Sequence, residues 1–112
     1  MNAQRKLRKN TMPKAYWVGA HMTIRDLDKL KAYAKLAAQA SAEHGGRVLA
    51  RGGAGAGKVM SLEGFDQSRV AVTEFPSMKA AVDCFHSQTY QTAMAKLDDG
   101  VERDIFIVEG LE

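Results

Sequence analysis

The predicted strands of this chain are apolar on both faces, and this feature constrains its fold more than any other. Residues 15–22 (AYWVGAHM), 69–75 (RVAVTEF) and 104–109 (DIFIVE) carry apolar side chains at both odd and even positions. A sheet with one face in water alternates apolar and polar residues, so strands of this kind need cover on both sides. A chain of 112 residues has room for one modest core, and its helices can cover only one face of the sheet.

The second face is therefore expected to pack against another copy of the same chain. A homodimer that joins sheet to sheet about a twofold axis would bury that face. The alternative is that Trp17 and Phe106 are scattered surface residues, because single exposed apolar side chains are common on folded proteins. The partner expected from the sequence is thus the protein itself.

The predicted elements follow the order strand, helix, strand, strand, helix, strand. The strands span residues 15–22, 47–51, 69–75 and 104–109, and residues 58–63 are expected to be extended as well. Two strand-helix-strand halves of this kind form an antiparallel sheet with both helices on one face. The predicted fold class is therefore α+β, a ferredoxin-like βαββαβ sheet assembled as a dimeric α+β barrel.

Capping residues and glycines mark both predicted helices. The first helix begins after Thr23 or Asp26, either of which can accept a backbone hydrogen bond as its N-cap. It ends at residues 45–46 (GG), because glycine adopts the left-handed conformation that often follows a helix. Ser77 caps the second helix, whose apolar stripe slips in the middle, and this slip predicts a kink or a break near Ser87.

The net charge of +3 comes from the N-terminal segment and not from the folded body. Residues 1–14 hold five bases and no acid, whereas the other 98 residues hold 11 bases and 13 acids. We expect residues 1–12 to form a disordered basic tail and residues 13–112 to form a single domain. A body near neutrality has no electrostatic footprint for nucleic acid, and no apolar run approaches the roughly 20 residues that span a membrane. Neither is an expected partner.

The stretch 52–59 (GGAGAGKV) differs by one residue from a phosphate-binding P-loop. Val59 stands where that motif has a Ser or Thr whose hydroxyl holds magnesium. The residues after Lys58 do not resemble a helix start, and the parallel strand-helix-strand context is missing. We interpret the stretch as a flexible link or a bulged bend, with a mobile flap over a pocket as the alternative.

A pocket between the sheet and the second helix is expected to bind a small organic ligand. Its candidate residues lie on adjoining elements and are His21, Arg51, Glu74 and Tyr90. His21 has the parity of Trp17 and is expected to share its face, where Gly19 leaves room for a ligand. The alternative for His21 is a hydrogen-bonded structural role.

Two further candidates also have structural alternatives. Glu74 would be a general base with a raised pKa, or a strand-end carboxylate paired with Arg47 or Arg51. Tyr90 lies where the helical stripe slips, so its hydroxyl faces a cleft or its ring belongs to the core. No residue is assigned a catalytic role.

The histidines and the single cysteine give no sign of a metal or redox site. His21, His44 and His86 form no H-x-x-x-H pattern and no cluster with cysteine, so neither a metal nor a cofactor is expected. Cys84 cannot form an internal disulfide, which favours a reducing cytoplasm as the location. It is expected to be a buried, inert thiol.

Several segments together resemble a small bacterial family, the domain-of-unknown-function family thirteen-thirty. They are AYWVGAHMT, EHGGRVLARGG, LEGF followed by RVAVTEFPS, then SQTYQ and IFIVEG. The resemblance covers residues 12–110 and implies a member of the dimeric α+β barrel superfamily. The stretch GGAGAGKVMSLEG departs from the family in being longer and richer in glycine, and the basic tail lies outside the family pattern.

The resemblance carries over no catalytic residue, because the family has no established reaction, and the two functional hypotheses rest on the candidate residues. The superfamily contains ligand-sensing domains, and it also contains cofactor-free monooxygenases, lactone isomerases and haem-degrading enzymes. The first hypothesis is a homodimeric small-molecule-binding module. The second is a cofactor-independent enzyme of the monooxygenase or isomerase type that acts on a small organic acid. In the second, His21 or Glu74 would be the base and Arg51 would hold a carboxylate.

Overall fold

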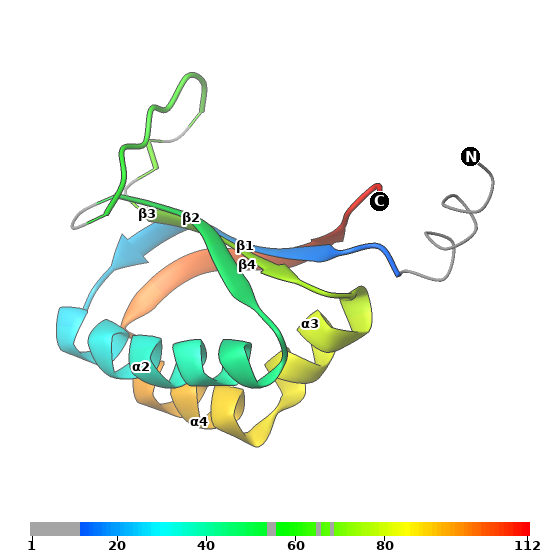
Figure 1. Ribbon diagram of the computed structural model, residues 1–112. Helices are drawn as coiled ribbons and strands as arrows, with labels where there is room; N and C mark the ends of the chain where they lie inside the picture. The colour runs from blue at the N-terminus through cyan, green and yellow to red at the C-terminus, as the bar shows by residue number, and fades with distance from the viewer. Residues whose placement is uncertain (1–11, 54–55, 65, 68) are drawn as a thin grey trace.

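The helices of this protein lie together on one face of a four-stranded sheet (Figure 1). The computed structural model describes residues 12–53, 56–64, 66–67 and 69–112. Strands β1 (Ala15–Ile24), β2 (Arg47–Gly53), β3 (Arg69–Phe75) and β4 (Val101–Glu109) pair antiparallel in the order β2-β3-β1-β4. The predicted α+β class and the ferredoxin-like arrangement are confirmed. The predicted tail, residues 1–12, lies outside the described residues except for Met12, which is exposed.

Strands β1 and β4 are both longer than the sequence predicted. β1 continues to Ile24 and β4 begins at Val101, and these two residues pair with each other. The polar run that opens β4 therefore belongs to the sheet. This extension matters for the site, because it places Arg103 within a strand.

Local signals set the ends of α2 (Leu27–Glu43), the helix that follows β1. The side chain of Asp26 accepts a hydrogen bond from the backbone N–H of Lys29 at 3.1 Å and so caps the first turn. Gly45 has a φ of 77°, the left-handed conformation that commonly follows a helix end. Asp26 is the cap and Thr23, the alternative, lies in β1.

The second helical region is broken at Ser87 into α3 (Met78–His86) and α4 (Gln88–Leu97). Ser87 has an extended backbone, with φ −66° and ψ 153°. Its hydroxyl donates to the carbonyl oxygen of Cys84 at 2.7 Å and accepts from the backbone N–H of Tyr90 at 3.1 Å. The predicted break near Ser87 is confirmed, and one side chain closes α3 and caps α4.

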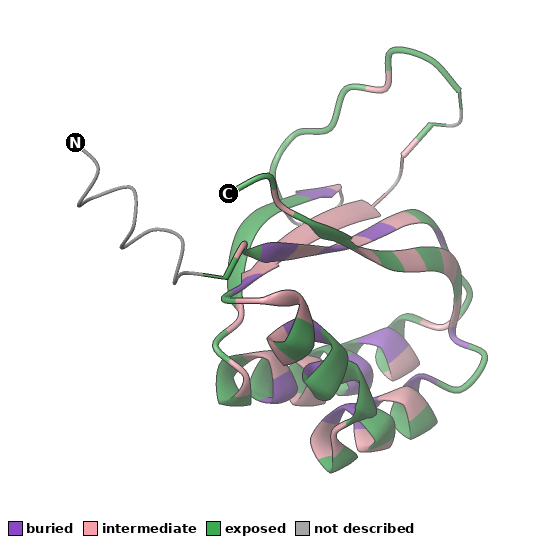
Figure 2. Ribbon diagram, turned by 90° about the vertical axis from the view of Figure 1, so that its right-hand side faces the viewer, coloured by how far each residue is buried: buried purple, intermediate pink, exposed green. Residues whose placement is uncertain are grey.

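The core lies between the sheet and the helices (Figure 2). On the inner face of β1, Ala15 and Trp17 are buried, and they contact buried residues from α2, α3 and α4. The opposite face of the sheet also carries apolar side chains, together with the charged residues Glu74 and Asp104. Residues of this outer face include Tyr16, Val18, Val72, Phe106 and Val108. Phe106 and Val108 remain 50% and 49% exposed, so the described residues leave this face uncovered.

A bulge in β1 changes which of its residues face the core. The pairing register with β4 shifts between Ala20 and Thr23, and His21 has a φ of 54°. Beyond the bulge Met22 is buried, whereas His21 is exposed. The prediction that His21 shares the face of Trp17 is therefore wrong, because one extra residue at a bulge inverts the alternation of side chains.

The glycine-rich segment leaves the sheet on the side away from the helices (Figure 1). Gly57 forms an isolated bridge with Gly52, and the described residues 58–63 form neither a strand nor a helix. The missing helix agrees with the rejection of a P-loop. Met60 and Leu62, in the described part of this loop, are largely exposed.

Replacing Ser87 with alanine should destabilise the protein by about 1 kcal/mol, because α4 loses its N-cap and the carbonyl of Cys84 loses a donor. Ser87→Asp is the matched control, since aspartate retains an acceptor for the N–H of Tyr90. Urea unfolding followed by circular dichroism would measure both differences. Equal stability of the alanine variant and the wild type would contradict this role of Ser87.

Candidate functional site

Two tyrosines and one arginine meet between the sheet and the helices. The hydroxyl of Tyr33 on α2 is 2.8 Å from the hydroxyl of Tyr90 on α4, and both side chains are buried. Arg103 on β4 donates from Nη2 to the Tyr90 hydroxyl at 3.4 Å. Its guanidinium carbon also lies 4.6 Å from the centroid of the Tyr33 ring, within range of a cation–π contact. Three elements of the fold therefore converge on one polar cluster.

The hydroxyl of Tyr90 is held in its neutral form. Burial raises its pKa well above the ordinary value, and the neighbouring Tyr33 adds to the effect, while Arg103 acts in the opposite direction. A neutral phenol can donate one hydrogen bond and accept others. Tyr90 can therefore accept from Arg103 while it shares a second hydrogen bond with Tyr33.

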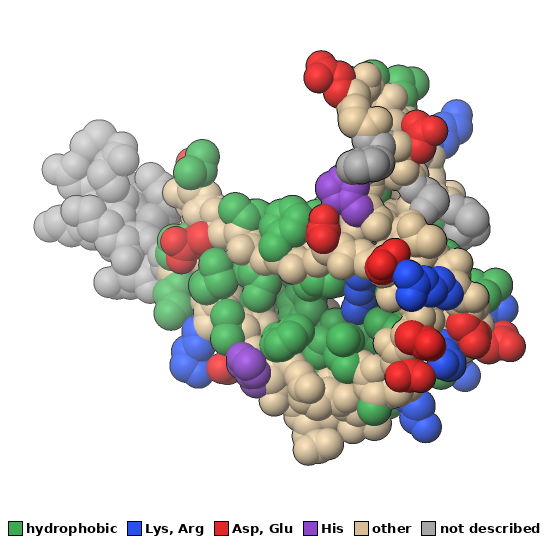
Figure 3. Space-filling view, turned by 180° about the vertical axis from the view of Figure 1, so that it is seen from behind, with side chains coloured by type: hydrophobic (Ala, Val, Ile, Leu, Met, Phe, Trp, Pro, Cys, Tyr) green, Lys and Arg blue, Asp and Glu red, His purple; other side chains and the backbone are tan. Residues whose placement is uncertain are grey.

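A cleft opens beside Tyr90, between α4 and β4. Its volume is about 340 Å³, within the range of small-molecule sites. The residues that line it are mainly apolar, with a few charged groups at one end: Phe85, Tyr90, Met94, Leu97, Asp98, Val101, Glu102, Arg103 and Ile105. Figure 3 shows hydrophobic side chains bordering a hollow between the two layers, with charged side chains around its rim.

A second and smaller cavity also borders Tyr90. Its volume is about 80 Å³, and its lining combines aromatic residues with Ala37, the aliphatic hydroxyls of Ser41 and Thr73, and the thiol of Cys84. Trp17 borders this cavity, and its ring lies 5.1 Å from that of Tyr90 and 6.1 Å from that of Phe85. Because this space is too small for most metabolites, the larger cleft is the better candidate for a binding site.

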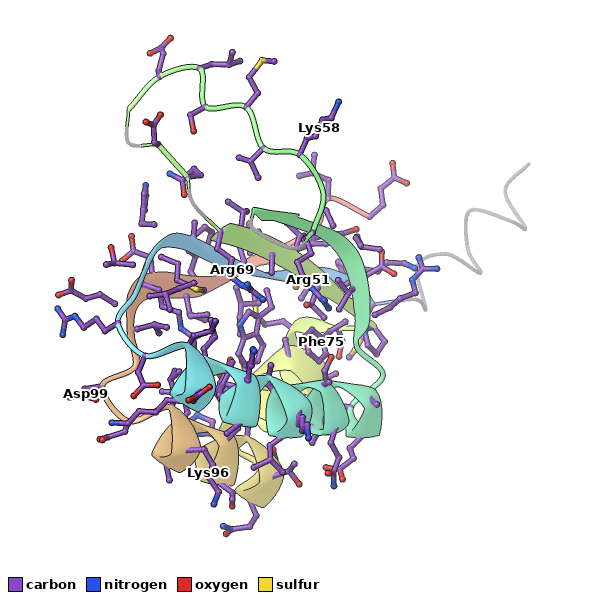
Figure 4. All side chains as sticks on the ribbon, turned by 90° about the vertical axis from the view of Figure 1, so that its left-hand side faces the viewer. Arg51, Lys58, Arg69, Phe75, Lys96 and Asp99 are labelled. Atoms are coloured by element: carbon purple, nitrogen blue, oxygen red, sulfur yellow. The ribbon has the colours of Figure 1, made fainter. Side chains whose placement is uncertain are left out.

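Of the four residues predicted from the sequence to form the pocket, Tyr90 borders both cavities. The described linings of these cavities contain none of His21, Arg51 and Glu74. Arg51 is exposed on β2 and points, like Arg69, from the sheet toward α2 (Figure 4). That Arg51 contacts a ligand stays a prediction.

The other two candidates have partners of their own. Nδ1 of His21 lies 2.8 Å from a carboxylate oxygen of Asp104, and its backbone N–H donates to the side chain of Gln67. The carboxylate of Glu74 lies 3.3 Å from Arg47 and 3.6 Å from Lys14. The alternative for Glu74, a strand-end carboxylate paired with Arg47, is the arrangement observed.

Arg103 and Tyr33 were not identified from the sequence. A signal for Arg103 was present, because Arg103, Ile105 and Ile107 share one parity, which in β4 is the inner one. The predicted strand began only at residue 104, so Arg103 fell outside it. Tyr33 lies beside the apolar stripe of α2, and no local pattern distinguishes it from an ordinary core residue.

Metal-binding clusters are absent from the described part of the chain. No group of three or more His, Cys, Asp or Glu side chains is placed there to hold an ion. The same part contains no helix with the length and hydropathy needed to cross a membrane.

A family model described as Domain of unknown function (DUF1330) matches residues 14–111. Solved structures share the fold, among them the following two. The RPA0582 protein of unknown function from Rhodopseudomonas palustris is 16% identical, with a TM-score of 0.72, and 99% of this chain and 93% of that chain are covered. SnoaB, a cofactor-independent oxygenase from Streptomyces nogalater, is 10% identical, with a TM-score of 0.60 and coverage of 89% and 95%. No curated protein matches.

Cys84 should be nearly unreactive toward thiol reagents while the protein is folded. Its side chain is 1% exposed, and burial raises its pKa to about 11. At pH 8 this lowers the thiolate fraction about 100-fold relative to an unfolded chain. We expect 5,5′-dithiobis(2-nitrobenzoate) to label the urea-unfolded protein at least about 100-fold faster than the native one. Comparable rates would contradict this placement of the thiol.

The same shift predicts how stability depends on pH. The folded state favours the neutral thiol, so its contribution is complete below pH 9 and is lost as the pH rises toward 11. The stability difference between wild type and Cys84→Ala should therefore shrink over that interval. A difference that is constant between pH 8 and 11 would count against a raised pKa.

Proposed function

We propose that this chain, which belongs to the DUF1330 family of domains of unknown function, is a homodimeric module that binds a small molecule between its sheet and α4. The observation that carries the proposal is the cleft of about 340 Å³ beside Tyr90. Its apolar lining would remove the body of a ligand from water, and its few polar groups would orient the ligand. We also propose a cytoplasmic location, because a reducing compartment would keep the single cysteine as a free thiol.

The polar groups beside the cleft are held in fixed positions, and this supports binding. Tyr33, Tyr90 and Arg103 hold one another in place through the contacts described above, so they need not reorganise when a ligand enters. A preformed polar group loses less conformational entropy on binding than a mobile one. Met94 adds a flexible apolar wall, and its sulfur lies 3.7 Å from Arg103.

The exposed apolar face of the sheet supports the homodimer. Phe106 and Val108 lie on the outer face next to Val18 and Tyr16, to which they are paired across the β1–β4 ladder. A continuous apolar surface of this kind on a soluble protein marks an interaction site. Two copies packed face to face would cover both outer faces with one isologous contact.

The dimer can be tested by sedimentation. At micromolar concentration the wild type should have about twice the 12.2 kDa mass of the chain, and Phe106→Asp should shift it to the monomer, because a charge would be buried in the interface. Leu27→Asp is the matched control. Leu27 is 51% exposed, like Phe106, but lies in the first turn of α2, where aspartate is favourable. A monomeric wild type would refute the homodimer.

Ligand binding can be tested by blocking the cleft. A panel of small aromatic and alicyclic compounds, screened by thermal shift, should contain members that stabilise the wild type. Met94→Trp should abolish those shifts, because the larger ring fills the cleft. Lys96→Trp is the control, since Lys96 is exposed and points away from the sheet (Figure 4). Shifts that survive in Met94→Trp would place binding elsewhere.

A second candidate is a cofactor-independent enzyme that acts on a small organic acid by general acid/base chemistry. It is favoured by the shared fold with SnoaB, a cofactor-independent oxygenase. His21 or Glu74 as base and Arg51 as carboxylate holder remain the roles to test. Binding is preferred because His21 and Glu74 are engaged with Asp104 and Arg47 and do not border the cleft. Oxygen consumption or conversion of any compound that binds would favour the enzyme instead.

A further inference from the structure

Arg103 lacks a partner of opposite charge, although it is partly buried. All 13 acidic residues of the chain belong to its described part, and no carboxylate there forms an ion pair with Arg103. Its neighbours are the Tyr90 hydroxyl, the Tyr33 ring and the sulfur of Met94, none of which is charged. Because a guanidinium carries five N–H donors, most of its donors are left for a ligand.

The two acidic residues that line the same cleft already form ion pairs, Glu102 with Arg25 and Asp98 with Lys29, which Asp98 shares with Asp99. Asp98 accepts from Nζ of Lys29 at 3.0 Å, and Glu102 lies 3.0 Å from Nη2 of Arg25. Both acids are exposed at the rim, whereas Arg103 reaches inward to the tyrosines. Among the residues that line the cleft, Arg103 is therefore the charged group that points inward, and an anion is the charge that it would stabilise there.

Two further arginines share the inner face of the sheet with Arg103. In the sheet register Arg51 pairs with Ala71, and Gly53 pairs with Arg69, which places both arginines on the inner side. Among the described residues neither forms an ion pair. With Arg103 on β4, at the opposite edge from β2, the three cations are spread over the width of the sheet, about 14 Å at the usual strand spacing. Positive side chains on this face attract anions into the space between the layers.

The other residues that line the cleft indicate the polarity of the rest of the ligand. Phe85, Leu97, Val101 and Ile105 offer rings and aliphatic side chains but no hydrogen-bonding side chain. A ligand that satisfies both parts of the cleft has one anionic end and one apolar body. A guanidinium binds a carboxylate through two parallel hydrogen bonds, the geometry for which arginine is best suited.

We propose that the ligand is a small organic acid with an apolar ring or chain, whose carboxylate is bound by Arg103 and whose body occupies the cleft between α4 and β4. The inference rests on the proposed binding function. In it Arg103 is the specificity-determining residue, and Arg51 and Arg69 guide the anion inward without contacting it in the final complex. The sequence predicted that Arg51 holds a carboxylate. In this proposal Arg51 acts during association of the anion and does not hold it in the final complex.

The proposal is tested with matched pairs of probes that differ only in charge. Benzoate, phenylacetate and cyclohexanecarboxylate are each compared with the corresponding amide by titration calorimetry. At least one acid should bind the wild type 10-fold or more tightly than its amide, since charge-assisted hydrogen bonds are the stronger kind. Arg103→Met should remove this preference and Arg103→Lys should retain part of it, because lysine keeps the charge but not the planar fork.

The controls separate a local contact from a general charge effect. Lys96→Met removes an exposed positive charge on α4 and should leave the preference unchanged. Arg51→Met should slow association of the acid and weaken its salt dependence, with less than about a 3-fold change in dissociation rate.

Each outcome bears on a different statement. Equal binding of acid and amide to the wild type, or an acid preference that survives in Arg103→Met, would overturn the role of Arg103 and leave the binding function standing. If no acid binds but neutral members of the wider panel do, the ligand class is wrong. If nothing in either set binds the wild type, the binding function itself fails. Should Arg103→Met not fold, Arg103→Lys and the wild-type probe pairs still decide.

Discussion

The hydrogen bond between the hydroxyls of Tyr33 and Tyr90 is the contact on which the rest of the site depends. It joins α2 to α4 in the buried layer beneath the sheet, where an unpaired hydroxyl would cost stability. Tyr90 reaches this position because the break at Ser87 turns α4 relative to α3, and α4 begins at Gln88, two residues before Tyr90. The Arg103 guanidinium is then held between the two phenols, so the helix break, the helix pair and the sheet all contribute to one cluster.

The two faces of the sheet have different physical roles. The inner face provides the core through Trp17 and its aromatic neighbours, and it also carries the arginine that enters the cleft. The outer face carries Phe106 and Val108 and has no cover from the part of the chain that the structure describes. In the proposed assembly the outer faces hold two copies together, which leaves the inner layers free to bind a ligand. In this proposal, assembly and binding use opposite sides of the same four strands.

Much of the fold could be predicted because its determinants are local. Asp26, Ser77 and Ser87 cap the helices through side-chain contacts three residues away, and Gly45 ends α2 by its own backbone preference. The candidate site was less predictable. Tyr90 was identified because it lies beside the break in a helical pattern, and Glu74 proved to be paired with Arg47, one of the alternatives that the sequence left open. Arg103 was missed because residues 102–104 are polar, so the start of β4 at Val101 was not recognised from the sequence.

The sequence by itself determined the order of the elements, the helix ends and the excess of apolar strand surface, since each depends on residue type and spacing along the chain. Only the tertiary structure decided which polar groups meet. Tyr33 and Tyr90 are 57 positions apart, and their contact depends on how α2 and α4 pack. Because of a single bulge in β1, His21 lies beside Asp104 and not on the inner face. Side-chain direction in a strand depends on an unbroken register, and register is a property of the paired strands and not of one strand alone.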